Sequence, residues 1–122
     1  MEGPRLYSYK GCGTCREARK WLKEHAISFI EIPIRETPPS PRDLARLLQS
    51  YAGNRRVILN TSGADYRQPG MKERLAEMDD PEFLAFLSQR GNLIKCPVWL
   101  SSEIALAGFN AVTWEKSGIL VR

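Results

Sequence analysis

Residues 7–16 read Tyr7-Ser8-Tyr9-Lys10-Gly11-Cys12-Gly13-Thr14-Cys15-Arg16. The alternating, aromatic-rich segment Arg5–Tyr9 predicts a short strand that ends in a glycine turn. From Thr14 onward the apolar residues recur at helical spacing, at Cys15, Ala18, Trp21 and Leu22. A Cys-x-x-Cys pair, Cys12 and Cys15, therefore lies between a strand and the start of the helix that follows it.

The next segment predicts how these two elements continue into a sheet. Residues Ser28–Ile32 have strand composition, and the linkers on both sides of the helix are short. A strand, a crossover helix and a second strand normally give a parallel pair.

The middle of the chain, about residues 40–91, predicts a helical insert. Ser40 followed by Pro41 is typical of a helix start, and Gly53 is expected to end that helix. Residues 60–63 read as a loop, and Met71, Leu75 and Met78 suit a second helix. A third helix opens at Asp80-Pro81, and we expect Gly91 to end it. No linker rich in serine or glycine occurs, so we expect one domain over residues 1–122.

Strand composition returns in the last third of the chain. It is found at Leu93–Ile94 and Pro97–Leu100, and Ile104–Ala107 is expected to pair back as a hairpin. A short helix around Trp114 follows. The predicted fold class is α/β: a mixed four-stranded sheet with a helical insert between strands 2 and 3.

Composition and charge exclude several classes of protein. With 43% hydrophobic and 26% charged residues, the 122-residue chain is typical of a soluble globular domain rather than a disordered or coiled-coil protein. The net charge of +4 favours anionic partners such as a thiolate, an oxyanion, glutathione or an acidic protein surface, whereas the basic residues are too scattered to indicate nucleic-acid binding. No apolar run suits a membrane span or signal peptide, so we expect a cytoplasmic location and no membrane partner.

The position of the cysteine pair predicts thiol chemistry. A helix N-terminus stabilises a thiolate, and Cys12 lies where exposure is greatest, so we assign it the nucleophile role. Cys15 lies one turn further in and is suited to resolve a mixed disulfide at Cys12. Gly11 and Gly13 leave the backbone compact and Cys12 open to a substrate.

Two other interpretations of the cysteines stay open. The pair can be buried and inert, or Cys12, Cys15 and Cys96 can supply three of the four ligands of a zinc site. The one histidine, His25, lies about 15 Å along the helix from Cys15 and cannot complete such a site, so no metal is expected. His25 is interpreted as a cation at the helix C-terminus.

Beyond the cysteine motif, nearly the whole chain resembles the thioredoxin fold and, more narrowly, the arsenate reductase/Spx family. The matching segments are residues 7–16, residues 35–40 (Arg-Glu-Thr-Pro-Pro-Ser), the helical insert, Ile94-Lys95-Cys96-Pro97, and Gly108-Phe109-Asn110. The resemblance implies a glutaredoxin-like sheet, a catalytic Cys12 and a cis Pro97 facing the Cys-x-x-Cys pair. The substrate-binding residues that we expect around the pair are Lys10, Gly11, Gly13, Thr14, Arg16, Lys95, Cys96 and Pro97.

The chain also departs from the family pattern. Members that reduce arsenate hold the oxyanion with arginines, at positions where this chain has Leu59-Asn60-Thr61, Cys96 and the uncharged segment Ile104–Gly108. The cysteine pair is similar to that of the Spx branch, whose members bind RNA polymerase near a glycine at the position of Gly53. Spx members also have an arginine where this chain has Cys96.

Three functional hypotheses follow. The first is a thiol–disulfide oxidoreductase with no bound cofactor, reduced by glutathione, glutaredoxin or thioredoxin. The second is a redox-sensing regulator of Spx type that binds RNA polymerase, and the third is a glutathione-coupled arsenate reductase. For Cys96 we consider two roles: a small space-filling residue beside the proline, or a third thiol that accepts the disulfide from Cys12 or protects a sulfenic acid there.

Overall fold

The computed structural model describes residues 3–120 and contains one four-stranded mixed sheet. Its strands are β1 (Arg5–Ser8), β2 (Ile30–Pro33), β3 (Val98–Leu100) and β4 (Ala105–Ala107), in the order β2-β1-β3-β4. β1 and β2 are parallel, as predicted, whereas β3 is antiparallel to both β1 and β4. The predicted α/β fold is confirmed.

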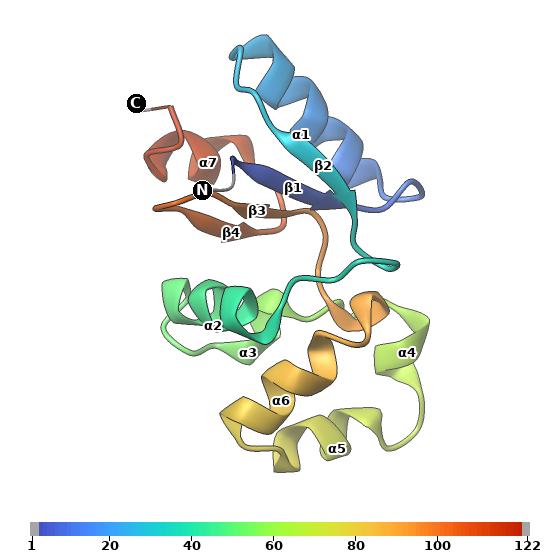
Figure 1. Ribbon diagram of the computed structural model, residues 1–122. Helices are drawn as coiled ribbons and strands as arrows, with labels where there is room; N and C mark the ends of the chain where they lie inside the picture. Colours follow the sequence, from blue (N-terminus) through green and yellow to red (C-terminus); the bar gives the residue numbers. More distant parts are fainter. Residues whose placement is uncertain (1–2, 121–122) are drawn as a thin grey trace.

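Two helices cover one face of the sheet (Figure 1). They are α1 (Gly13–Glu24) and α7 (Ala111–Lys116). Because side chains alternate along a strand, Leu6, Trp99 and Leu106 point to this face, where they pack in one cluster with the buried side of α1 and Trp114 of α7.

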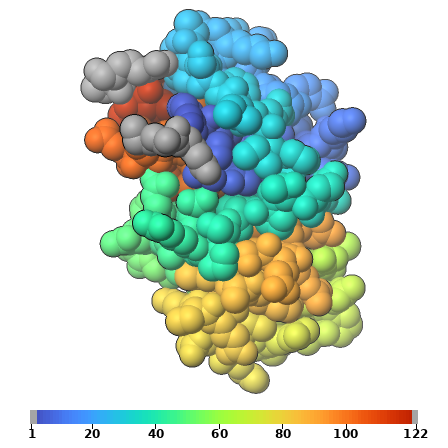
Figure 2. Space-filling model, in the orientation of Figure 1, coloured from blue at the N-terminus to red at the C-terminus, as the bar shows by residue number. Residues whose placement is uncertain are grey.

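The helical insert between β2 and β3 covers the opposite face (Figure 1). It consists of α2 (Pro41–Ser50), α3 (Arg55–Ile58), α4 (Ala64–Arg67), α5 (Met71–Glu77), α6 (Asp80–Leu87) and the 3₁₀ turn η1 (Gly91–Leu93). Sheet residues of the opposite parity, including Tyr7, Val98 and Leu100, pack against it. In Figure 2 the yellow and orange part of the insert forms the end of the molecule farthest from α1.

The sequence did not predict α3 and α4. Each has only four residues, which is about one turn and too short to show an apolar period. The side chain of Asn54 caps α3 by accepting a hydrogen bond from the Arg56 N–H, and this cap is the one local signal for α3.

Two predictions in the C-terminal part of the insert are wrong. Leu93 and Ile94 do not form a strand: Leu93 ends η1, and Ile94 makes a single antiparallel bridge with Leu59. Gly91 does not end α6, which stops at Leu87. Gly91 is buried, and a Cβ there would collide with the backbone of Ile34, so this glycine permits a close approach of two chain segments.

The end of α2 also differs from the prediction. The helix ends at Ser50, three residues before Gly53. Ala52 and Gly53 then take positive φ angles of 56° and 81°, and the Gly53 N–H donates to the Leu48 carbonyl at 3.0 Å. Gly53 thus belongs to the turn after the helix and is exposed. Within residues 3–120, no helix combines the length and apolar character that a membrane crossing needs.

Candidate thiol site

Cys12 is the N-cap residue of α1. Its backbone is extended, with φ −97° and ψ 113°, and its N–H donates to the Tyr9 carbonyl at 3.0 Å, which closes the turn after β1. The Cys12 Sγ accepts a hydrogen bond from the Cys15 N–H at 3.4 Å. The sulfur therefore lies against the positive end of a 12-residue helix and is half-buried rather than enclosed.

Cys15 has the opposite environment. It lies on the inward face of α1 and has no solvent exposure. A hydrogen bond to the Cys96 thiol, followed by burial, holds the pKa of Cys15 well above its usual range. Cys15 is thus a protonated thiol at neutral pH, whereas Cys12 is the accessible member of the pair.

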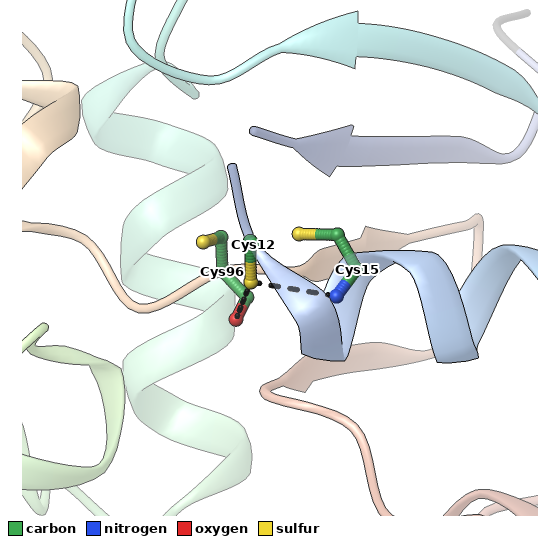
Figure 3. Close-up of side chains that lie close together, drawn as sticks. All are labelled: Cys12, Cys15 and Cys96. Carbon is green, nitrogen blue, oxygen red and sulfur yellow. Dashed lines mark hydrogen bonds between the residues drawn. The ribbon is translucent and has the colours of Figure 1, made fainter. Parts of the chain in front are cut away.

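Cys96 approaches the pair from the other end of the chain. It follows the insert and precedes β3, and the Cys96–Pro97 peptide bond is cis. The Cys12 thiol donates to the Cys96 carbonyl at 3.7 Å, and the three sulfurs all lie within 4.8 Å of one another. Figure 3 shows the three side chains converging from α1 and from the segment before β3. All three cysteines are free thiols.

The remaining predicted binding residues surround this cluster unevenly. Thr14, Lys95 and Cys96 line one pocket of about 390 Å³, which also reaches Tyr51 and Asn110. The Lys95 side chain is the only charged group in that pocket, and a Cβ at Gly108 would lie 2.9 Å from its Cε.

Lys10 belongs to a different pocket. This second hollow, of about 590 Å³, also includes Ser8, Arg19 and Glu31, whose side chains are joined by hydrogen bonds and an ion pair. Gly11 packs under the Tyr9 ring. The rest of the predicted set, Gly13, Arg16 and Pro97, lines neither pocket; Gly13 and Arg16 are exposed, and Pro97 is buried.

The sequence did not single out Tyr51 as a site residue. It is the C-cap of α2, and its hydroxyl accepts from the Ala107 N–H at 2.9 Å and donates to the Ala107 carbonyl at 3.4 Å. It was predicted only as part of the apolar face of that helix, and a 56-residue separation leaves no local sequence signal for the contact.

The side chain at one of the positions expected for an oxyanion-binding arginine is also engaged elsewhere. Asn60 is half-buried, and its Nδ2 donates to the Asn92 carbonyl at 3.3 Å. Like Cys96 and Ala107 at the other positions, it brings no positive charge.

Comparison with known proteins places this geometry in a family. Residues 7–117 match the model of the ArsC family, which is most of the chain. The chain belongs to the ArsC family. Among ArsC-family relatives, the uncharacterized protein YusI of Bacillus subtilis is 40% identical over 112 residues, or 92% of this chain and 95% of YusI.

More distant ArsC-family relatives fall on both sides of the family. The global transcriptional regulator Spx of Enterococcus faecalis is 28% identical over 86% of this chain and 78% of its own. The crystal structure of a possible arsenate reductase from Streptococcus mutans superposes with a TM-score of 0.80 at 28% identity, covering 88% of this chain and 92% of that one. The fold and family are thus shared with proteins of two different named functions.

Proposed function

We propose that this protein is a thiol–disulfide oxidoreductase in which Cys12 attacks and Cys15 resolves. The observation that carries the proposal is the contrast within the pair: Cys12 is half-exposed at a helix N-terminus, and Cys15 is buried beside it. An accessible thiol at such a position is the one a disulfide substrate meets first.

The proposed reaction balances in two exchanges. The Cys12 thiolate attacks one sulfur of a substrate disulfide, forms a mixed disulfide and expels the other sulfur as a thiolate. Cys15 then loses its proton and attacks the Cys12 sulfur, which releases the second substrate thiolate and leaves a Cys12–Cys15 disulfide. Both electrons that reduce the substrate come from the pair, and an external thiol must restore them. Glutathione, glutaredoxin or thioredoxin is the proposed donor.

A redox-sensing regulator is the second candidate. The observation in its favour is the similarity to proteins named as global transcriptional regulators, together with the exposed Gly53 after α2. In that case oxidation of the pair changes affinity for RNA polymerase and no turnover occurs.

Arsenate reduction has less support. Lys95 is the only charged residue lining the pocket beside Cys96, so a doubly charged oxyanion there meets one cation. Charge-assisted contacts from several guanidinium groups are what such an oxyanion normally requires.

Steady-state turnover distinguishes the three candidates. We expect reduction of a mixed glutathione disulfide by the wild-type protein, loss of turnover in Cys12→Ser, and a trapped mixed disulfide at Cys12 in Cys15→Ser. Lys20→Ala, on the exposed side of α1, is the matched control and should behave as wild type.

Each other outcome assigns the protein differently. Robust glutathione-coupled turnover of arsenate would replace the proposal with the third candidate. A single oxidation without turnover, accompanied by a changed affinity for purified RNA polymerase, would replace it with the second.

A further inference from the structure

The three thiols form a set of possible metal ligands made of sulfur alone. Within the described part of the chain, residues 3–120, Cys12, Cys15 and Cys96 form the one group of three or more cysteine, histidine or acidic side chains close enough to share an ion. A set of three sulfurs without oxygen or nitrogen ligands favours soft ions and disfavours calcium, magnesium and manganese.

The size of the cluster suits a three-coordinate ion. Because no two of the sulfurs are more than 4.8 Å apart, a point exists that lies within about 2.8 Å of all three. Bonds from thiolate sulfur to a first-row ion of this kind measure about 2.3 Å. Each sulfur therefore needs to move by about 0.5 Å, which is the difference between those two lengths.

The surroundings provide access and charge compensation. Cys12 and Cys96 are half-buried, so an ion can reach them from solvent, while Cys15 forms the buried floor of the cluster. Three thiolates around one monovalent ion carry excess negative charge. The N-terminus of α1, whose Cys15 N–H already points at the Cys12 sulfur, is placed to offset part of it.

We propose that Cys12, Cys15 and Cys96 form a binding site for a soft monovalent ion of the copper(I) class. Binding forms three metal–sulfur bonds and releases three thiol protons to solvent, and no electrons are exchanged. Zinc needs a fourth ligand, which these side chains do not supply, so it is held more weakly. The bound ion occupies the Cys12 thiol, and copper and a disulfide substrate therefore exclude each other.

Competition with a chromogenic copper(I) chelator tests the site. Reduced full-length protein, kept free of oxygen, should withdraw one equivalent of copper(I) from the chelator. Loss of an outer-shell partner alone typically weakens metal binding about 10- to 100-fold, so Cys96→Ser and Cys96→Ala should each weaken it at least tenfold. Glu17→Gln, exposed on the same helix, is the matched control and should bind as wild type.

Cys96 keeps the test independent of folding, because it is only half-buried and both of its variants should fold. X-ray absorption of the loaded protein should show three sulfurs at about 2.3 Å. Failure to withdraw copper(I), wild-type affinity in both Cys96 variants, or a shell of two sulfurs overturns the proposal, and so does zinc binding of equal strength. The disulfide-turnover assay is separate, so failure of one proposal leaves the other standing.

Discussion

The three cysteines differ in exposure although their sulfurs are neighbours. Cys15 has no exposed surface, whereas Cys12 lies half-buried at the helix start. We therefore expect iodoacetamide to modify Cys12 faster than Cys15 in the native protein, both because of access and because the pKa of Cys15 is raised. Peptide mass mapping over a time course measures both rates. Unfolded protein is the control, in which the two rates should converge, and faster labelling of Cys15 in the native state would contradict the role assigned to each thiol.

Gly91 provides a test of packing at a single atom. An alanine Cβ there would overlap the backbone of Ile34 and Arg35, neither of which can move like a flexible side-chain end. We expect Gly91→Ala to lower the free energy of unfolding by about 1–3 kcal/mol or more.

Urea unfolding measures this effect, and Gly13→Ala is the matched control. A Cβ at Gly13 meets nothing within 4 Å, and alanine favours the helix by up to about 1 kcal/mol, so that variant should be as stable as wild type or more so. Equal stability of Gly91→Ala and wild type would mean that the two segments separate at little cost.

At this scale the sequence predicts part of the site. Cys12 and Cys15 follow from a motif four residues long, because strand, turn and helix composition place it unambiguously. Cys96 and Pro97 could be placed beside the pair only through the family resemblance, since 84 positions separate Cys96 from Cys12. Tyr51 was missed as a site residue because its contact with Ala107 depends on how α2 packs on the sheet.

Among the elements, the short helices of the insert are joined largely by one arginine. The Arg55 guanidinium donates to the Leu75 carbonyl at 3.1 Å and to the Met78 carbonyl at 2.9 Å, and it lies 4.4 Å from the centre of the Phe83 ring. It also pairs with Asp80 at 2.6 Å, although that carboxylate is largely exposed and adds little. α3, the end of α5 and the start of α6 therefore meet at this side chain.

A lysine cannot reproduce this forked set of contacts. We expect Arg55→Lys to lower the free energy of unfolding by about 1–3 kcal/mol, because two carbonyls lose a charged donor. The adjacent Arg56 is exposed, so Arg56→Lys in the same urea titration should differ little from wild type. If the two variants prove equally stable, Arg55 is not what joins the three helices.

The predictability of the elements follows their length and caps. α1, α2 and α6 carry apolar faces over eight or more residues, and the caps of α2 and α6, Ser40 and Asp79, each precede a proline in the first turn, so their starts were predictable. α3 and α4 are single turns whose helical form depends on neighbours. Leu93–Ile94 has strand composition, but only one bridge, to Leu59, is available to it.

For the whole molecule, the sheet separates two cores that share its strands. All three tryptophans, Trp21, Trp99 and Trp114, lie in the core under α1 and α7, and their rings are about 6 Å apart. Most of the helical residues outside α1 lie in the insert on the other face. Tryptophan fluorescence and far-UV circular dichroism therefore report on different halves of the molecule.

We expect these two signals to show the same urea midpoint, because neighbouring residues of β1 and β3 belong to opposite cores. Leu47→Ala, in the insert core, should lower the free energy of unfolding by about 2–5 kcal/mol by both signals, although no tryptophan lies in that core. Leu22→Ala, in the other core, is the reciprocal variant. A fluorescence midpoint that ignores Leu47→Ala would show that the insert unfolds by itself.

The overall topology was predictable because a strand–helix–strand start and a terminal hairpin leave few ways to order four strands. The packing of the insert was not, because it depends on contacts such as that between Gly91 and Ile34, which carry no periodic signal.

The separation of Cys12 and Cys96 along the chain has a consequence for the polymer itself. The 84 positions between them contain β2 and the entire insert, so an ion that joins the three sulfurs turns this linear chain into a ring with two tails. Closing a loop of this length removes unfolded-state entropy equivalent to about 4–5 kcal/mol for as long as the link persists. The loaded protein should melt at a higher temperature, and its unfolded form should have a smaller hydrodynamic radius than the metal-free chain. A Cys12–Cys15 disulfide closes a loop of only four residues and changes neither quantity to that extent.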